Sequence, residues 1–384
     1  MEVYFDNAAT TKVIPEVREI MLETMDVEYG NPSSMHIKGV GAERYIKYAK
    51  EQISKQLKCE TKEITFTSGG TESNNLALIG MAKANNRAGK HIITTPIEHA
   101  SVYNPILYLQ DEGFDVSFAS VDEKGIVDVE KLKGQLTNET IMVSVMAVNN
   151  EIGAVEPIEE IASVIKEYNK QNGTNILFHV DAVQAFGKMV IYPKRIGIDA
   201  MSMSGHKIHG PKGSGALFVD NRVKIKPIIY GGGQEKGLRS GTENTAAISG
   251  MGKACEIMYA RLKENLASMK KVKEHLINGA LAIEGVTDNS GDAAHIASLS
   301  FEGVRSEVLL HALEDKGICV SAGSACSSNH PEISGVLKAI GLKQELLDST
   351  LRFSFCEYNT IEEAEYVVEA LKGLLPMLRK YTRR

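Results

Sequence analysis

The stretch Ser202-Met203-Ser204-Gly205-His206-Lys207 closes an apolar run that predicts a β-strand. Upstream, His179-Val180-Asp181-Ala182-Val183-Gln184 predicts a second strand that ends in an acid. A lysine among serine, glycine and histidine at a strand end is poorly suited to a core, but it is well suited to form a Schiff base with a carbonyl cofactor. An upstream carboxylate is the partner that a pyridine nitrogen needs. The two stretches together predict a site for pyridoxal phosphate (PLP).

Strands and helices alternate around these two stretches, which favours a mostly parallel sheet covered by helices. After about residue 249 the pattern changes, and one long amphipathic helix to about 282 leads into a smaller α+β region. We expect strands at 63–67, 91–95, 115–121, 141–148, 175–182, 200–204, 215–219, 297–301, 318–321 and 351–355, and helices from 72, over 101–112 and over 157–172.

The composition is that of an ordinary globular protein. The chain has 384 residues, of which 43% are hydrophobic and 24% charged, enough for two domains. A net charge of -6 argues against nucleic-acid binding. The five cysteines form no C-x-x-C pair, so neither a zinc site nor a thioredoxin-type motif is indicated. Since no stretch has the length of a membrane span and no leader is visible, we expect a cytoplasmic protein with reduced thiols and no membrane partner.

The stretch Thr67-Ser68-Gly69-Gly70-Thr71-Glu72-Ser73-Asn74 joins a strand to a helix. Glycines let the backbone approach an anion, and a helix start presents N–H groups, so a phosphate site is one interpretation. An ordinary N-cap by Ser68 or Thr71 is the other. The stretch lacks the pattern of a nucleotide-binding P-loop, and no G-x-G-x-x-G opens a βαβ unit early in the chain.

Other polar residues also follow strand ends, where ligands gather in open α/β sheets. Asp181 could pair with a pyridine nitrogen or form a structural ion pair. Gln184 could bond the phenolic oxygen of the ring, and His99 could stack on the ring or be structural. Asn150 lies in a pair of amides that suggests ligand contacts or a turn. Lys207 could be a surface lysine, but Ser204 and His206 supply phosphate-type donors beside it.

Two further residues point to chemistry near the C-terminus. Cys326 lies in Ser321-Ala322-Gly323-Ser324-Ala325-Cys326-Ser327-Ser328-Asn329, a small and polar stretch with no apolar neighbours to bury a thiol. This favours Cys326 as a mobile nucleophile, whereas the other four cysteines lie in or beside patterns typical of helices and strands. In Leu351-Arg352-Phe353, strand alternation separates Arg352 from the apolar face, where it could clamp a carboxylate or lie at the surface.

Taken together, these motifs resemble those of NifS/IscS-type cysteine desulfurases, in the class V aminotransferase group of fold-type I PLP enzymes. The resemblance covers nearly the whole chain in the expected order. It is also carried by Tyr4-Phe5-Asp6-Asn7-Ala8-Ala9-Thr10-Thr11, Gly30-Asn31-Pro32-Ser33-Ser34-Met35-His36, Glu98-His99, Asn149-Asn150-Glu151-Ile152-Gly153 and residues 231–242. It implies a large PLP-binding domain over 14–257, with a mostly parallel seven-stranded sheet. Residues 1–13 and 258–384 would form a small domain that carries the cysteine loop.

The resemblance also implies roles for individual residues. Lys207 would carry PLP, and Cys326 would accept sulfur from L-cysteine, which becomes L-alanine. The PLP contacts would come from Gly70, Thr71, His99, Asn150, Asp181, Gln184, Ser204, His206 and, from a neighbouring subunit of a homodimer, Thr242. Asn150 and Arg352 would bind the substrate carboxylate. His99 would move a proton. No resident metal is expected, although Cys326 could serve as a transient iron–sulfur ligand.

The partner is less defined, because the chain stops soon after its last helix while many housekeeping relatives have a longer tail. We expect an iron–sulfur scaffold or another sulfur-acceptor protein. The alternatives are a selenocysteine lyase or another fold-type I PLP enzyme such as an aminotransferase. A non-catalytic scaffold with a vestigial site is a different class of function. A zinc hydrolase using His206 and His209 is weaker still, because no acidic third ligand lies nearby in the sequence.

Overall fold

The computed structural model describes residues 1–322 and 334–382. Its centre is a seven-stranded sheet in the order β2-β8-β7-β6-β5-β3-β4. Only β8 runs antiparallel to its neighbours, so the predicted α/β fold with a mostly parallel sheet is confirmed. The strands are β2 (Ile64–Thr67), β3 (His91–Thr94), β4 (Asp115–Phe118), β5 (Thr140–Met146), β6 (Leu177–Asp181), β7 (Ala200–Ser204) and β8 (Gly215–Val219).

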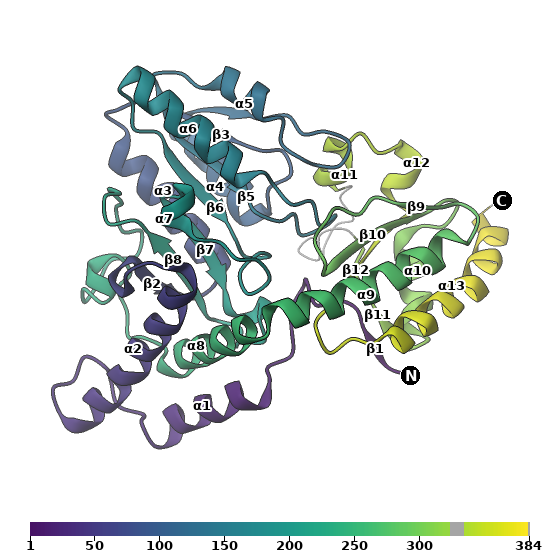
Figure 1. The fold of residues 1–384 in the computed structure, drawn as a ribbon, viewed down its shortest axis with the longest axis horizontal. Coiled ribbons are helices and arrows are strands. Elements are labelled where there is room, and N and C mark those ends of the chain that lie inside the picture. Colours follow the sequence, from purple (N-terminus) through teal and green to yellow (C-terminus); the bar gives the residue numbers. More distant parts are fainter. Residues whose placement is uncertain (323–333, 383–384) are drawn as a thin grey trace.

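Helices cover both faces of this sheet, as Figure 1 shows. Alternation along the strands separates two cores: on β8, Leu217 packs in the core under α3 and α4, and Phe218 packs in the core under α6 and α8. The helices of this unit are α1 (Pro15–Asp26), α2 (Ile37–Leu57), α3 (Gly70–Asn85), α4 (Ala100–Asp111), α5 (Val129–Gln135), α6 (Ile158–Asn172), α7 (Pro193–Ile196) and α8 (Thr245–Ala260), with short 3-10 turns at Thr61–Glu63, Gly205–Lys207 and Glu235–Gly237.

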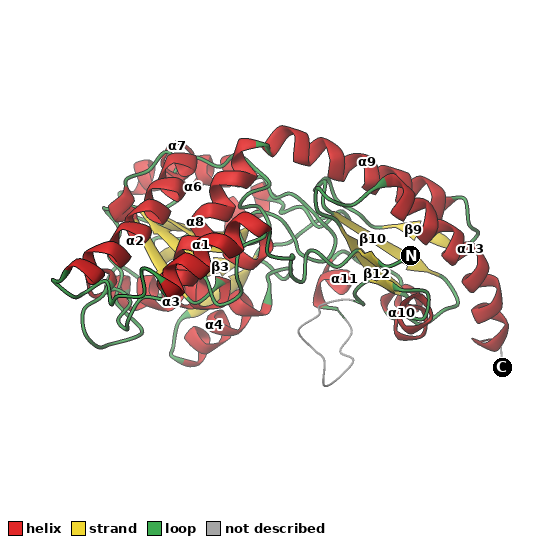
Figure 2. Cartoon of the chain, turned by 90° about the horizontal axis from the view of Figure 1, so that it is seen from below, coloured by secondary structure: helices red, strands yellow, loops and turns green. Residues whose placement is uncertain are grey.

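A second unit follows, built on a smaller antiparallel sheet in the order β12-β10-β9 (Figure 2). Val3 and Phe5 pack in its core with Phe301 and Phe353, so the two ends of the chain share one core. The domain bounds 14–257 and 1–13 with 258–384 stay a prediction. The elements are β1 (Val3–Tyr4), α9 (Leu262–Leu281), β9 (Val286–Asp288), β10 (Ile296–Phe301), α10 (Ser306–Glu314), β11 (Ile318–Cys319), α11 (Gly335–Ala339), α12 (Gln344–Leu347), β12 (Thr350–Ser354) and α13 (Ile361–Thr382).

The prediction of one long helix to about residue 282 is wrong in one respect. The segment forms two helices, α8 and α9, which meet at Arg261 with φ -121° and ψ 20°. Neither glycine nor proline marks the break in Ala260-Arg261-Leu262. The cause is tertiary, because α8 packs against α1 and α2 while α9 packs against α13 of the second unit. Figure 1 shows this change of partner where α8 gives way to α9.

Among the described residues, no helix is long and apolar enough to cross a membrane. The predicted cytoplasmic location is not tested by the fold.

His179 lies at the middle of the large sheet and generates a testable prediction about acid stability. Its ring is fully buried between Ser144 Oγ at 2.8 Å and Ser202 Oγ at 3.0 Å, and burial lowers its pKa to about 3. The unfolded chain therefore binds this proton more readily than the native state. We expect unfolding free energy to fall as the pH drops from about 6.5 towards 3, by at most about 1.4 kcal/mol per pH unit from this group.

Guanidinium unfolding of the parent and of His179→Gln at several pH values between 7 and 5 measures this contribution. The variant should show a shallower loss of stability with acid. His275→Gln on α9 is the matched control, because the His275 side chain is 40% exposed and lies on a helix outside the sheet. An identical pH slope in His179→Gln and the parent would contradict the assignment.

Candidate active site

A cavity of about 610 Å³ opens where the parallel strands end, as expected for an open α/β sheet. Asp181 ends β6, and Ser204 ends β7. The cavity brings together ten of the twelve predicted site residues. They are Gly70, Thr71, His99, Asn150, Asp181, Gln184, Ser204, His206, Lys207 and Arg352. Thr242 is exposed and does not line this cavity, and Cys326 falls outside the described residues.

Lys207 is held from both of its ends. The residue lies in a 3-10 turn directly after β7, and its Nζ donates to the carbonyl oxygens of Ala8 at 2.5 Å and Ala9 at 2.8 Å. Its own carbonyl accepts a hydrogen bond from Lys188 Nζ at 2.7 Å. Gln184 Nε2 also donates to the Ala8 carbonyl, at 3.0 Å. The N-terminal segment therefore orients the amine inside the cavity rather than letting it reach the surface.

A hydrogen-bond chain links Asp181 to His99. Asn74 donates from one amide nitrogen to Asp181 Oδ2 at 2.8 Å and to Ser101 Oγ at 2.9 Å. Ser101 Oγ lies 2.8 Å from His99 Nδ1, which also accepts from the Ser101 backbone N–H as the N-cap of α4. Because Nδ1 is an acceptor, the ring proton of a neutral His99 lies on Nε2. These hydrogen bonds hold the Asp181 carboxylate and the His99 imidazole in fixed orientations.

Burial raises the pKa of Asp181, although the Val183 N–H, His99, Asn74 and Lys207 all favour its charged form. A buried carboxylate in this position is stabilised by a cationic partner. A protonated ring nitrogen is such a partner.

The part of the cavity lined by Gly70 and Ser204 fits an anion. The helix α3 begins at Gly70, so the first N–H groups of its backbone have no partner within the helix. An added Cβ at Gly70 would lie 2.6 Å from Val183 Cγ2, so a larger residue there would force Val183 to move. Ser204 Oγ is buried and has no hydrogen-bond partner among the described residues. Glu72 also lines the cavity, and its charge is balanced by Arg239, whose Nε lies 2.9 Å away, and by the Ser68 N–H, which donates to it at 2.8 Å.

Arg352 also lines the cavity. Its sequence left open a carboxylate clamp or a surface position, and at 4% exposure the residue is not at the surface. One terminal nitrogen donates to the Asn150 carbonyl at 2.9 Å, and the other pairs with Asp6 Oδ1 at 2.8 Å. Asp6 Oδ1 also accepts from Ser321 Oγ at 2.8 Å. Arg352 Nε is buried with no partner among the described residues, which suits a ligand carboxylate.

The structure gives no support to a zinc hydrolase built on His206 and His209. His206 Nδ1 lies 3.3 Å from Thr10 Oγ1, whereas His209 Nδ1 lies 2.8 Å from the Lys12 carbonyl. Burial and then the charge of Lys207 lower the pKa of His206 to about 4, so its ring is neutral at neutral pH. The two rings thus have different partners, and His206 alone belongs to the cavity.

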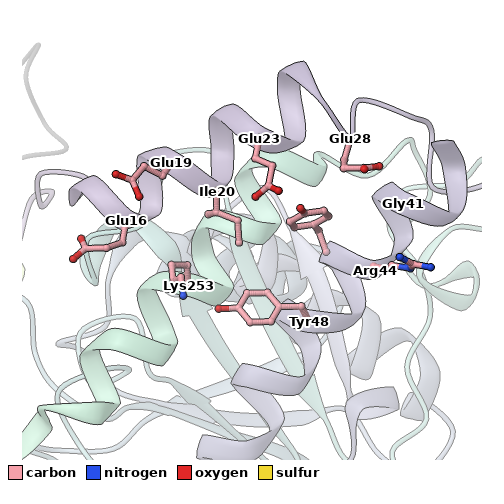
Figure 3. Close-up of a pocket in the computed structure, with 10 residues that line it drawn as sticks. Glu16, Glu19, Ile20, Glu23, Glu28, Gly41, Arg44, Tyr48 and Lys253 are labelled. Carbon is pink, nitrogen blue, oxygen red and sulfur yellow. The ribbon is translucent and has the colours of Figure 1, made fainter.

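A second hollow, of about 680 Å³, lies away from this chemistry, between α1, α2 and α8 (Figure 3). Its rim carries Glu16, Glu19, Glu23 and Glu28. Because these four carboxylates outnumber the two cations of the lining, Arg44 and Lys253, the hollow disfavours an anionic ligand such as a phosphate. The cavity around Lys207 is therefore the candidate active site.

Comparison with known proteins defines the class. The family model for class-V aminotransferases matches residues 3–367. A cysteine desulfurase IscS of Clostridium botulinum is 44% identical over 99% of this chain and 96% of its own, and one of Methanosarcina thermophila is 42% identical over 98% and 93%. Among solved structures, a NifS-like protein aligns with a TM-score of 0.93 at 38% identity, covering 98% of this chain and 100% of its own.

A structure of SspA in complex with cysteine also aligns, with a TM-score of 0.82 at 36% identity over 94% of this chain and 100% of that one. The chain therefore belongs to the class-V aminotransferase family. Within that family it belongs with the IscS/NifS cysteine desulfurases, as its motifs predicted. Enzymes of this family depend on PLP.

Several residues of the site were missed by sequence reasoning. They are Asp6, Ala8, Ala9, Asn74 and Ser101. Asn74 and Ser101 could have been selected, since Asn74 closes the stretch 67–74 and Ser101 lies two residues after His99. The carbonyls of Ala8 and Ala9 carry no side-chain signal. Asp6 lies far from Arg352 in the chain, so only the fold joins them.

Cys319, expected to behave as a small hydrophobe within an element, is instead exposed in β11.

The unpartnered hydroxyl of Ser204 gives a prediction with two opposite effects. In Ser204→Ala we expect PLP affinity to fall ~10-fold, since a hydrogen bond to a charged group is lost. The PLP-free protein should be as stable as the parent or more stable, because a buried hydroxyl without a partner is removed. PLP titration and guanidinium unfolding measure the two quantities.

Ser202→Ala is the matched control, because Ser202 Oγ is already bonded to His179. Its expected effect is the reverse: lower stability of the PLP-free protein, by about 1 kcal/mol, with little change in affinity. Parental PLP affinity in Ser204→Ala would remove Ser204 from the cofactor site.

Proposed function

We propose that this protein removes sulfur from L-cysteine, with Cys326 as the sulfur acceptor, and releases L-alanine. The observation that carries the proposal is one cavity that contains a half-buried lysine amine, a buried acid and a buried arginine, in a chain of the cysteine desulfurase group. Each of the three groups faces a different part of the expected cofactor and substrate.

The residues present fit PLP. Lys207 would hold the aldehyde carbon, Asp181 the ring nitrogen and Gln184 the ring oxygen, with His99 against the ring. Gly70, Thr71, Ser204 and His206 would hold the phosphate. This assignment accounts for the partnerless Ser204 hydroxyl and for a carboxylate buried at the end of β6. When bound, PLP withdraws electrons from the amino acid attached to it and so acidifies its Cα proton.

Arg352 orients the substrate. Its guanidinium is fixed by Asp6 and by the Asn150 carbonyl, the residue lines the cavity, and its Nε is buried without a partner among the described residues. A carboxylate bound there places the amino acid's Cα towards Lys207. Because the arginine is already rigid, little side-chain freedom is lost when substrate binds. Asn150 would contribute to the same end of the substrate.

Two residues move protons. The Lys207 amine, oriented by Ala8 and Ala9, is placed to take the Cα proton of the substrate. The neutral His99 ring carries its proton on Nε2, because Nδ1 accepts from the Ser101 N–H. It can therefore exchange a proton with the substrate thiol.

Cys326 takes the sulfur. Its thiolate attacks the substrate sulfur, the substrate C–S bond breaks, and an S–S bond forms. The electron pair of the broken bond ends on carbon, which is protonated to the methyl group of alanine. Overall, L-cysteine and the Cys326 thiol give L-alanine and a Cys326 persulfide, so atoms and electrons balance without an external oxidant.

The proposal also includes a sulfur-acceptor protein and a second copy of the chain. The persulfide sulfur would pass to an iron–sulfur scaffold or another acceptor protein. Two chains would form a homodimer in which Thr242 reaches the neighbouring phosphate, and the enzyme would work in the cytoplasm. No nucleic acid is required by any of these steps.

Incubation with L-cysteine and a reductant, with sulfide and alanine measured together, tests the function directly. Equal amounts of the two products are expected. Alanine formed from selenocysteine but not from cysteine would favour a selenocysteine lyase. Amino transfer that depends on a keto acid would favour an aminotransferase, and either result would overturn the proposal.

The variant Cys326→Ser should retain PLP and its visible absorbance but lose persulfide formation, with cysteine desulfuration falling at least ~100-fold because the nucleophile is gone. Absorbance spectra and persulfide labelling measure the two properties. Cys319→Ser is the matched control, since this thiol is exposed and lies outside the cavity. Desulfuration by Cys326→Ser at the parental rate would show that another group accepts the sulfur.

A further prediction separates binding from positioning. Arg352→Gln should raise KM for L-cysteine by ~100-fold, because a charged contact to the carboxylate is lost. Asp6→Asn should raise KM by ~10-fold, since the arginine keeps its charge but loses the ion pair that holds it. Steady-state kinetics measure both.

Asp348→Asn is the control for Asp6→Asn, because Asp348 pairs with Arg305 at an exposed site of the same unit. A parental KM in Asp6→Asn would show that the Asp6 ion pair does not position Arg352.

A further inference from the structure

A second cluster of chemically active side chains lies beside the active site but takes no part in the proposed reaction. It comprises His209, Cys356 and Glu357, whose ligand atoms all lie within 4.8 Å of one another. His209 Nε2 is 3.2 Å from Glu357 Oε2. A tetrahedral zinc ion with bonds of about 2.0–2.3 Å separates its ligand atoms by roughly 3.3–3.6 Å. The cluster therefore needs only small side-chain adjustments to surround such an ion.

The ligand positions are held by contacts outside the cluster. The backbone N–H of His209 donates to Thr11 Oγ1 at 2.7 Å, and its Nδ1 faces the Lys12 carbonyl at 2.8 Å. A carbonyl can only accept, so Nδ1 carries hydrogen and Nε2 is the nitrogen left for a metal, as in many metal-bound histidines. The backbone N–H of Cys356 donates to Asn359 Oδ1 at 2.9 Å.

The side chains are also buried. His209 and Cys356 are 2% and 9% exposed, and the Glu357 side chain is 11% exposed. Water therefore competes weakly for these ligands. A thiolate, an imidazole and a carboxylate together form a donor set that suits zinc, whereas magnesium and calcium prefer oxygen alone.

Charge balance is compatible with a dication. Burial alone would lower the pKa of His209, but hydrogen bonds with Cys356 and Glu357 outweigh it and raise that pKa to about 9. The nearby Lys188 interacts by charge with Glu357 and Cys356, and burial lowers its own pKa to about 8. A zinc ion would take the place of the hydrogen that His209 Nε2 shares with Glu357.

We propose that His209, Cys356 and Glu357 bind one zinc ion, with water as the fourth ligand. The site joins the two units of the molecule, since His209 follows Lys207 after β7 and Cys356 follows Arg352 after β12. Zinc bound there fixes the segment that carries the lysine against the segment that carries the arginine. The site is separate from the cavity and uses none of the residues assigned to PLP.

Zinc titration of the PLP-loaded full chain tests the site, in a Cys326→Ser background so that this thiol does not bind the metal. Calorimetry with zinc chloride gives the stoichiometry and the dissociation constant, and X-ray absorption gives the ligand atoms. We expect one equivalent with a single sulfur neighbour at about 2.3 Å. Thermal unfolding should shift upwards on zinc addition.

Cys356→Ser and His209→Gln should each weaken zinc binding by ~10- to 100-fold or more. Glu357→Gln, which keeps the shape of the side chain, should weaken it as well, and it provides a test if either of the other variants fails to fold. Cys319→Ser is the matched control and should bind zinc like the parent, although its thiol is the more exposed one.

A zinc affinity that is unchanged in Cys356→Ser or in Glu357→Gln would overturn the proposal. A metal shell without sulfur would overturn it as well. Loss of binding in Cys319→Ser alone would assign the metal to β11 and contradict the site.

Discussion

The hydrogen bonds from Lys207 Nζ to the carbonyls of Ala8 and Ala9 are the contacts on which the site depends. The segment that supplies them is itself held on both sides. The Ala8 N–H donates to Ser354 Oγ of the second unit at 2.8 Å, and the Thr11 N–H donates to the His206 carbonyl at 2.9 Å. The amine is thus placed by backbone groups that cannot rotate away, at the line where the two units meet.

The same segment sets the position of the arginine. Asp6 pairs with Arg352, and the bridge between Asp6 and Ser354 continues the pairing of the N-terminus with the second unit. Lysine and arginine therefore share one scaffold, although they lie in different units. Since reacting groups must be placed within about an ångström, a common scaffold explains how two separate units can act on one small amino acid. The third group, the buried Asp181, lies at the end of β6 in the large sheet and lines the same cavity.

Much of this site follows from the sequence because its residues lie at strand ends. The strand ends themselves are predictable: 200–204 and 215–219 match β7 and β8 to the residue. What could not be predicted depends on contacts between distant segments. The break at Arg261 has no local signal, and the helices α1 and α2 were not predicted. The contacts of a backbone carbonyl such as that of Ala8 cannot be predicted from the residue type, because every residue has this group. For Arg352 the sequence left open a carboxylate clamp or a surface position. Only the fold shows that its guanidinium is buried against Asp6.

Reduction of the purified protein with borohydride, followed by peptide mass spectrometry, tests the central claim most directly. The account predicts a pyridoxyl group on the peptide that contains Lys207. A pyridoxyl group on another lysine, Lys188 included, or on none, would contradict it.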